Sequence, residues 1–345
     1  MMADQKIDVH AHFVPPVYRK ALLDNGITNP DGMPGTPAWT VESHLDFMNA
    51  TGIAKSILSI SSPGTTITSD PSSNKKLARD TNEFAAEVKR NHQDRFGFFA
   101  SLPFSAADAA VEEVKYALDE LNADGFVVLS NTAGIYLGDP CLRPVLEELD
   151  KRKAVVFVHP TIACHQNHTH KNHSPAEQYS TSSPLATVYR APLFEFFFDS
   201  ARSILDLINS GTVLRFPNIR WIVSHCGNVL PSLLDRMFLV LRLGQKFTTA
   251  RDGLEITEGQ IKSVLRKQFW FDLAGDPVPN LVDALLKFTG KERLMFGSDV
   301  PWTPFEVTKT LVARIERDLP DCVGADAVGM IMKDTAQKLL STKEL

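Results

Sequence analysis

Eight short apolar segments recur along the chain, and they restrict the possible folds more than any other feature of the sequence. Each segment is rich in β-branched and aromatic residues and is closed by a turn-forming residue. Their hydrophobicity is nearly continuous rather than alternating, which is typical of parallel strands that are buried on both faces. The segments span 6–13, 54–61, 95–103, 123–130, 154–160, 219–227, 269–275 and 293–301.

Amphipathic patterns between these segments predict helices. In 105–121, for example, Val111, Val114, Leu118 and Leu121 fall on one side of a helix, and charged residues fall on the other. This alternation of strand and helix predicts an α/β protein with a (β/α)8 TIM barrel. A doubly wound open sheet is the alternative, but no glycine-rich phosphate loop follows the first strand. The other predicted helices span 75–91, 140–152, 194–210, 229–242, 278–289, 304–318 and 325–340.

Two long connections interrupt this pattern. Residues 14–41 follow the first strand, and residues 160–192 follow the fifth. In a barrel both would be loop insertions at the C-terminal face, where active-site loops belong. We find neither an internal repeat nor a domain linker, so we expect residues 1–345 to form a single domain.

Composition excludes several classes of function. With a net charge of -5 and 43% hydrophobic residues, the chain has the profile of a soluble globular protein. Lys and Arg are not clustered, which argues against binding to nucleic acid or to a membrane surface. No apolar run approaches the roughly 20 residues that span a bilayer, and we see no signal peptide. The four cysteines are widely spaced, so we expect reduced thiols in a cytoplasmic protein, located in the cytosol.

Five polar side chains lie at the ends of predicted strands. His10 and His12 end the first strand and, two residues apart, project to the same side. His159 ends the fifth strand, His225 the sixth and Asp299 the eighth. A barrel would gather all of them around one mouth. Because imidazole and carboxylate are the ligands of Zn²⁺ and similar divalent ions, the sequence predicts a metal site there.

The stretches around these residues carry a family resemblance. They read DVHAHFVPP, VVFVHPT, SHCGNVLPSLLDR and LMFGSDVPW, and the further stretches FGFFASLP and DGFVVLSN extend the match along the chain. On these motifs the chain resembles the amidohydrolase superfamily, in particular its amino-carboxymuconate-semialdehyde decarboxylase-like family of metal-dependent, non-oxidative decarboxylases. Within that family it is most similar to the fungal 6-methylsalicylate decarboxylases of polyketide secondary metabolism.

The resemblance implies a single metal ion. His10, His12, His159 and Asp299 would hold it, with His225 beside it as a catalytic or substrate-contacting residue. Binuclear hydrolases of the superfamily need a Lys or Glu from the fourth strand to bridge two ions, and GFVVLSN has neither. We expect Zn²⁺, with Mn²⁺ or Mg²⁺ as alternatives, and no organic cofactor.

The implied reaction converts 6-methylsalicylate, a small aromatic carboxylic acid, to 3-methylphenol (m-cresol) and CO₂. Loss of CO₂ is slow unless the ring carbon that bears the carboxylate is protonated, so the site needs a proton donor. We expect Asp299 to supply the proton and His225 to polarise the phenol or to shuttle the proton, although these roles could be exchanged.

The substrate ring also needs an apolar slot. Trp302 follows Asp299 closely and is a candidate contact. A phenylalanine-rich stretch supplies further candidates, which are Phe194, Phe196, Phe197 and Phe198. Arg202 resembles one member of an acid–Arg pair in relatives, here with Asp199. It could reach a substrate carboxylate or a neighbouring subunit, and an ordinary ion pair is equally open.

Two other functions fit the same residues. One is a metal-dependent hydrolase of a lactone or amide on the same barrel. The other is a non-catalytic metal-binding protein that uses the histidine-rich stretch 161–175, in which we expect a solvent-facing lid, to bind ions. Relatives tend to be dimers or larger, so the resemblance also implies a homodimer or a higher homo-oligomer.

Overall fold

A barrel of eight parallel strands forms the centre of the molecule in the computed structural model, which describes residues 6–163, 183–244 and 254–341. Neighbouring strands follow the order β1-β2-β3-β4-β7-β8-β9-β10, and every pairing in this sheet is parallel. The predicted TIM barrel is therefore confirmed. The strands are β1 Lys6–His12, β2 Ile53–Ser59, β3 Phe96–Ser101, β4 Gly125–Leu129, β7 Val155–His159, β8 Arg220–Val223, β9 Phe269–Asp272 and β10 Leu294–Met295.

The last and first strands close the barrel. β10 is only two residues long, but the chain after it continues alongside β1. The amide of Val9 donates to Phe296 O at 3.1 Å, and the amide of Asp299 donates to His10 O at 2.7 Å. These hydrogen bonds place Asp299 directly beside the histidines of β1.

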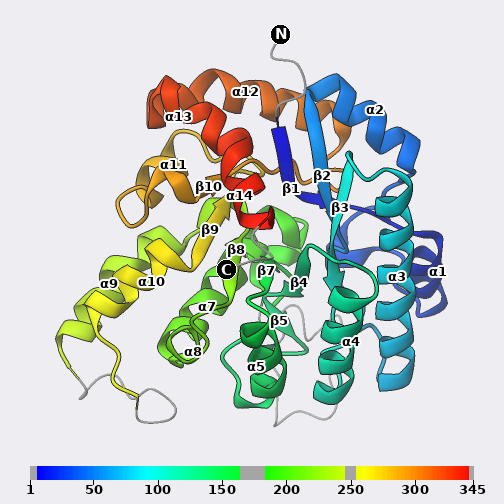
Figure 1. The fold of residues 1–345 in the computed structure, drawn as a ribbon, viewed down its shortest axis with the longest axis horizontal. Coiled ribbons are helices and arrows are strands. Elements are labelled where there is room, and N and C mark those ends of the chain that lie inside the picture. Colours follow the sequence, from blue (N-terminus) through cyan, green and yellow to red (C-terminus); the bar gives the residue numbers. More distant parts are fainter. Residues whose placement is uncertain (1–5, 164–182, 245–253, 342–345) are drawn as a thin grey trace.

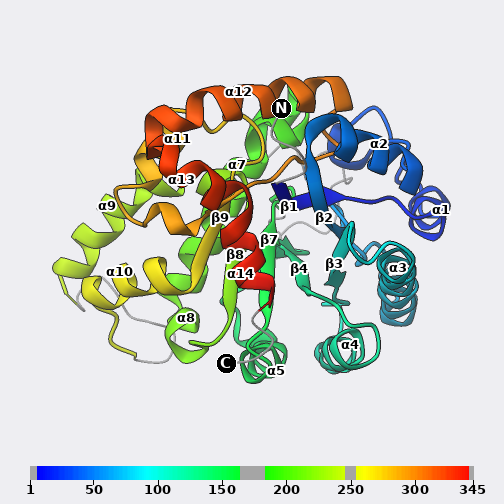
Figure 2. The same cartoon turned by 45° about the horizontal axis from the view of Figure 1, so that its top comes forward.

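Helices surround the strands on the outside (Figures 1 and 2). None of those in the described ranges is long and apolar enough to cross a bilayer. A small hairpin of β5 Asn131–Thr132 and β6 Ile135–Tyr136 follows β4. The helices are α1 Pro16–Asp24, α2 Val41–Thr51, α3 Pro71–Asn91, α4 Ala107–Asp119, α5 Arg143–Lys151, α7 Ala191–Asn209, α8 Thr212–Arg215, α9 Leu230–Arg242, α10 Glu258–Lys267, α11 Asn280–Leu285, α12 Phe305–Val323, α13 Ala325–Gly329 and α14 Thr335–Ser341.

Four helices, which are α1, α2, α8 and α10, were not predicted from the sequence. The connection 14–41 contains α1, so it is not a plain loop insertion. Both α2 and α10 begin with a capping box, formed by Thr40 with Ser43 and by Thr257 with Gln260. These caps satisfy amide groups at the helix start. They are local signals that the search for apolar periodicity did not use.

Two strands are shorter than predicted because the backbone leaves the extended conformation at the site. The predicted segment 219–227 ends its strand at Val223, and His225 has φ 51°. The predicted segment 293–301 ends its strand at Met295, and Asp299 has φ 63°. Left-handed backbone at non-glycine residues is costly and often occurs at functional sites.

Apolar side chains fill the inside of the barrel on the side away from the C-terminal ends of the strands. One buried cluster draws residues from seven of the strands, so it lies within the ring, and α14 covers it. The barrel is therefore packed rather than open as a pore, and a ligand can enter only at its C-terminal face. The cluster contains Ile7, Val9, Ile57, Phe99, Val127, Val155, Phe157, Ile222, Met295, Ala336 and Leu339.

Candidate metal centre

Four of the predicted residues meet at the C-terminal mouth of the barrel. His10 and His12 extend from β1, His159 from the end of β7 and Asp299 from the turn after β10, and their ligand atoms lie within 4.8 Å of one another. The Nε2 atoms of His10 and His12 are 3.1 Å apart. Asp299 Oδ1 lies 3.4 Å from Nε2 of His10 and 3.3 Å from Nε2 of His12.

These separations fit a single metal ion. A tetrahedral ion with ligand bonds of about 2.0–2.1 Å holds its donor atoms about 3.3–3.4 Å apart. The observed separations among His10, His12 and Asp299 run from 3.1 to 3.4 Å. The donor set of three imidazoles and one carboxylate is one that divalent transition metals accept.

Hydrogen bonds orient the three imidazoles for binding a cation. Each ring uses Nδ1–H to donate to a protein oxygen, which leaves the Nε2 lone pair free to bind an ion. Two such lone pairs only 3.1 Å apart, on His10 and His12, repel one another unless a positive charge lies between them. The acceptors are Asp272 Oδ2 for His10 at 3.0 Å, Ser59 O for His12 at 3.2 Å and Pro160 O for His159 at 2.7 Å.

The electrostatics of the cluster also favour a cation. Burial lowers the pKa of His12 and, strongly, that of His159, so both are neutral imidazoles at physiological pH, the form that binds a metal ion. Burial opposes a charge on His10 as well, but Asp272 and Asp299 outweigh it and raise its pKa to about 10. Although burial disfavours its charge, the adjacent imidazoles of His10 and His12 hold the pKa of Asp299 well below its usual range. A cation that binds would displace the proton that the raised pKa of His10 places on its Nε2, and the negative charges of Asp272 and Asp299 would then face the ion.

His225 completes the mouth beside the cluster. It lies in a short turn after β8, and its ring centroid is 4.8 Å from that of His10. The ring of Phe197 stacks on it at 5.6 Å with an interplanar angle of 27°. Burial lowers the pKa of His225, so it is a neutral imidazole that can either accept or donate a hydrogen bond.

A cavity of about 290 Å³ opens above these residues. His159, His225 and Asp299 contribute to its wall, together with apolar side chains that include Phe196 and Trp302. This volume is near the lower end of the range for small-molecule pockets, about 300–1,000 Å³, and suits a ligand with a single ring.

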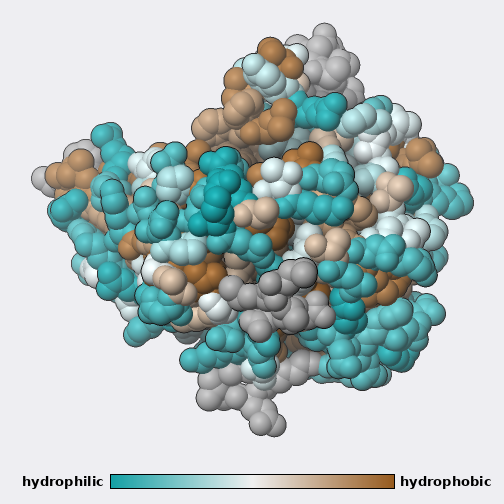
Figure 3. All heavy atoms as spheres, turned by 90° about the horizontal axis from the view of Figure 1, so that it is seen from above, coloured by the Kyte–Doolittle hydropathy of each residue, from teal (hydrophilic) through white to brown (hydrophobic). Residues whose placement is uncertain are grey.

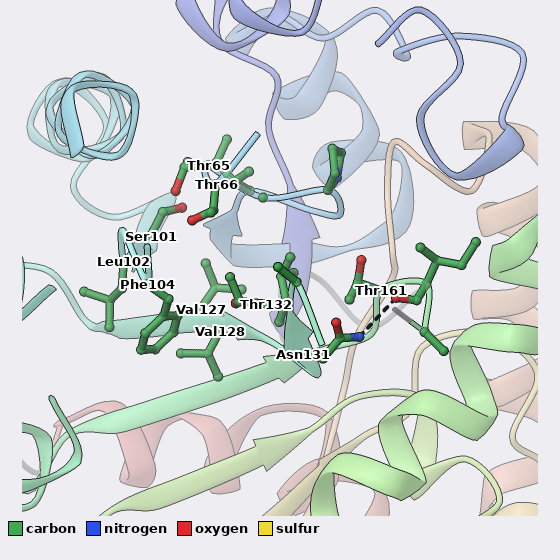
Figure 4. Close-up of a pocket in the computed structure, with 17 residues that line it drawn as sticks. Thr65, Thr66, Ser101, Leu102, Phe104, Val127, Val128, Asn131, Thr132 and Thr161 are labelled. Carbon is green, nitrogen blue, oxygen red and sulfur yellow. Dashed lines mark hydrogen bonds between the residues drawn. The ribbon is translucent and has the colours of Figure 1, made fainter. Parts of the chain in front are cut away.

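A second cavity of about 220 Å³ lies next to the first (Figure 4). Its wall combines hydroxyl and amide groups, such as those of Thr66 and Asn131, with apolar side chains such as Val127. Ser62 lines the first cavity and Thr161 the second, and their hydroxyl oxygens are 2.7 Å apart. The hydrogen bond between these two hydroxyl groups therefore lies between the two cavities.

The sequence pattern that defines the amidohydrolase family matches residues 7–342. The chain belongs to the amidohydrolase family. Its resemblance to that family, expected from the motifs, is thereby confirmed, and the match covers the whole barrel and the metal cluster.

Relatives of this amidohydrolase include named decarboxylases. It is 35% identical to decarboxylase yanB of Aspergillus niger, over 97% of this chain and 87% of that protein. It is 33% identical to 6-methylsalicylic acid decarboxylase acuB of Aspergillus aculeatus, over 94% of this chain and 93% of that protein. Among solved structures, a dihydroxybenzoic acid decarboxylase of Polaromonas sp. JS666, with bound manganese and the inhibitor 2-nitroresorcinol, has the same fold. The TM-score is 0.79 at 20% identity, over 99% of this chain and 98% of that one.

Of the residues predicted to contact the substrate, some line the metal-site cavity and others do not. Trp302 lines the metal-site cavity, as expected. Phe198 does not line it and is 47% exposed, whereas Phe196 does, with its ring 6.4 Å from that of His159. Residues two apart on a helix point about 200° away from each other, so only one of these two phenylalanines can face the mouth.

Arg202 forms the ordinary ion pair that the sequence left open. It donates to the buried carboxylate of Asp199 at 2.9 Å, and Tyr136 and Asn131 donate to the same carboxylate. The structure does not bring Arg202 to the lining of the metal-site cavity. A contact between Arg202 and substrate therefore stays a prediction. The histidines of the stretch 161–175, which are His165, His168, His170 and His173, lie outside the described residues.

Asp272 is a site residue that the sequence analysis missed. It is fully buried at the end of β9 and binds His10 through Oδ2, while Oδ1 accepts the amide N–H of His225 and of Ala274, each at 3.0 Å. His10 and the other donors outweigh burial and lower its pKa. Like the metal ligands, it closes a predicted strand, and that position was the available signal.

Asp8 is a second missed residue, and it fixes the turn that carries Asp299. Its carboxyl group accepts the hydroxyl of Ser298 at 2.6 Å and the amide of Ser298 at 3.0 Å. Burial raises its pKa to about 7 despite these hydrogen bonds. Asp8 thus ties the last turn of the barrel to β1, immediately beside the metal cluster.

Proposed function

We propose that this member of the amidohydrolase family is a metal-dependent, non-oxidative decarboxylase of ortho-hydroxybenzoates. Its substrate would be 6-methylsalicylate, and its products 3-methylphenol and CO₂. The observation that carries the proposal is the cluster of three histidines and Asp299, of which His159 and Asp299 line a cavity for one aromatic ring. The relatives yanB and acuB, both named as decarboxylases, support it over nearly the full chain.

One divalent ion fits the cluster. Held by His10, His12, His159 and Asp299, it would bind the acidic oxygens of the substrate and neutralise their charge. We propose zinc, because three nitrogen donors and one oxygen donor suit it. The manganese in the Polaromonas structure makes Mn²⁺ the alternative to be tested beside it.

The two oxygens of Asp299 have different surroundings, which suits proton transfer. Oδ1 faces His10 and His12, while Oδ2 accepts the hydroxyl of Thr303, at 3.0 Å. The low pKa of Asp299 means that it begins ionised. We infer that it first takes the proton of the substrate phenol and then gives it to the ring carbon that bears the carboxylate.

The electrons of the broken carbon–carboxylate bond then restore the aromatic ring, CO₂ leaves, and the phenolate takes a proton from water. His225 and Asp299 line the same cavity. The neutral imidazole of His225 would hold the phenol oxygen during these steps.

The decisive experiment offers a panel of salicylates and resorcylates to purified protein that was stripped of metal and reloaded with Zn²⁺ or Mn²⁺. Release of CO₂ together with the phenol is expected with a salicylate, and chelator should abolish it. Hydrolysis of an ester or lactone without CO₂ release would instead establish the hydrolase. Several weakly bound ions per chain without turnover would establish the non-catalytic metal-binding protein.

A further inference from the structure

Asp31 brings a second carboxyl group to the metal-site cavity, and the chemistry above does not use it. It belongs to the short segment Pro30–Gly32 in the connection between α1 and α2. It lines the cavity with His159, Asp299 and Trp302. Its φ of 54° lies in the left-handed region, which Asp and Asn tolerate better than most residues.

The surroundings of Asp31 leave its charge without a cationic partner in the described part of the chain. The hydroxyl of Ser62 donates to its carboxyl group, and the phenol of the buried Tyr18 is close enough to sense its charge. Burial raises the pKa of Asp31 to about 6, so it is ionised at neutral pH. Arg190 lines the same cavity but forms no ion pair with Asp31, and it is exposed and therefore screened by water.

This unneutralised carboxylate constrains what a substrate can carry. If the proposed function holds, the carboxylate that is lost binds at the metal cluster. A second carboxylate elsewhere on the ring would then be brought into the same small, partly dehydrated space as Asp31. Like charges at short range in such a space repel strongly. An uncharged substituent, or a hydroxyl that can donate to Asp31, meets no such penalty.

We propose that Asp31 is a specificity-determining residue, which excludes hydroxybenzoates that carry a second ring carboxylate from the metal-site cavity. The proposal rests on the proposed function and adds that the charge of Asp31 excludes substrates with a second ring carboxylate. It assigns the connection between α1 and α2 a role in the choice of substrate.

The test compares 6-methylsalicylate with 3-carboxy-, 4-carboxy- and 5-carboxysalicylate, using the metal-loaded full chain and its Asp31→Asn variant. Asn removes the charge and accepts the same backbone conformation. For each protein, kcat/KM for a carboxysalicylate is divided by kcat/KM for 6-methylsalicylate. For at least one isomer, we expect this ratio to be about tenfold or more higher in Asp31→Asn than in the wild type. Dissociation constants from calorimetry should shift in the same direction. If no isomer gains in either measurement, the proposal is wrong.

Two variants separate charge at this position from other effects. Asp31→Glu keeps the charge and should keep the exclusion. Asp24→Asn removes an equal charge from the nearby, solvent-exposed end of α1 and should leave the ratio as in the wild type. The same gain in Asp24→Asn would trace the effect to overall charge and overturn the proposal. If Asp31→Asn does not fold, Asp31→Ser replaces it.

The outcomes also separate this proposal from the proposed function. A wild-type protein that decarboxylates none of these acids would contradict the decarboxylase. Calorimetric binding of mono- and dicarboxylated rings to wild type and Asp31→Asn would still decide whether Asp31 excludes a second carboxylate.

Discussion

Asp272 fixes two histidines at once, although it neither lines the cavity nor belongs to the metal cluster. Its Oδ2 sets the tautomer of His10, and its Oδ1 holds the backbone of His225 in the turn after β8. A carboxylate behind a metal-binding imidazole fixes the ring and raises its basicity. The position of Asp272 thus links metal affinity to the position of the proposed catalytic histidine.

Replacing Asp272 by Asn should weaken metal binding, because the amide keeps the shape but loses the charge behind His10. Loss of such a partner typically costs about 10–100-fold in metal affinity. Competition with a chromophoric chelator would measure the change. Asp276→Asn, at a half-exposed residue paired with Arg314, is the matched control and should bind metal normally. Unchanged affinity in Asp272→Asn would mean that Asp272 only shapes the turn.

Removal of a nitrogen ligand and removal of the proton carrier should have different effects. His10→Ala takes away a buried donor, so we expect loss of both the ion and turnover. Asp299→Asn keeps an oxygen near the ion and should keep part of the metal, while the rate falls by about 100-fold or more. Metal analysis and decarboxylation assays on the same samples, with circular dichroism as a check on folding, distinguish the two. Full activity in Asp299→Asn would exclude it as the proton carrier.

Individual site residues differ in how far the sequence could predict them. Five residues were predictable because each lies at, or shortly after, the C-terminal end of a buried parallel strand, and a barrel places all such ends at one rim. They are His10, His12, His159, His225 and Asp299. Asp272 occupies the same kind of position, but a single Asp after a strand is also a common turn residue.

Other residues could not be assigned from periodicity. Phe196 and Phe198 both fit an apolar stretch, and only the rotation of α7 about its axis decides which one faces the cavity. Asp31 lies in a segment without regular secondary-structure periodicity, so nothing in the sequence indicates which side chain it faces. Its position follows from packing against Ser62 and Tyr18.

At the scale of elements, two of the helices that were missed, α2 and α10, are defined by the caps at their N-terminal ends. α2 has a capping box at Thr40 and Ser43 and closes with Gly52 in the left-handed conformation, φ 66°. Its buried residues are few, namely His44, Phe47 and Met48, so an apolar stripe is weak. Such a helix depends on its cap more than a strongly amphipathic one does.

Thr40→Ala should therefore destabilise the barrel by about 1 kcal/mol, the usual cost of losing an N-cap side chain. Denaturant unfolding with a constant m-value would measure it. Thr310→Ala is the control, because Thr310 is an exposed residue inside α12 that only bonds back to Glu306 O. Alanine suits that helical position at least as well. Equal destabilisation by both changes would contradict a special role for the cap.

At the scale of the whole molecule, apolar side chains are concentrated on part of the surface. Hydrophobic residues gather on a projecting edge of the face seen from above (Figure 3). Within the described residues, Val188 is 74% exposed, and Leu193, Phe194 and Phe198 are about half exposed. Contiguous exposed apolar residues of this kind often mark a contact between proteins.

We therefore expect the protein to be a homodimer or a larger homo-oligomer, as the resemblance to its relatives implies. Light scattering after size-exclusion chromatography, at several protein concentrations, measures the mass directly. Phe194→Ser combined with Leu193→Ser should shift the protein toward the monomer if this surface forms the contact. A monomeric wild type at all concentrations would contradict the expectation.

Closure of the barrel between β10 and β1 also has a consequence for folding during synthesis on the ribosome. The hydrogen bonds of Asp8 with Ser298 join residues 290 positions apart, and the metal cluster needs His10 and Asp299 together. A ribosome must have released nearly the entire barrel before these groups can meet. Until then a nascent chain has only the three histidines of the four-residue cluster to offer an ion at this site. Tight binding of the metal would thus distinguish finished molecules from incomplete ones in the cell.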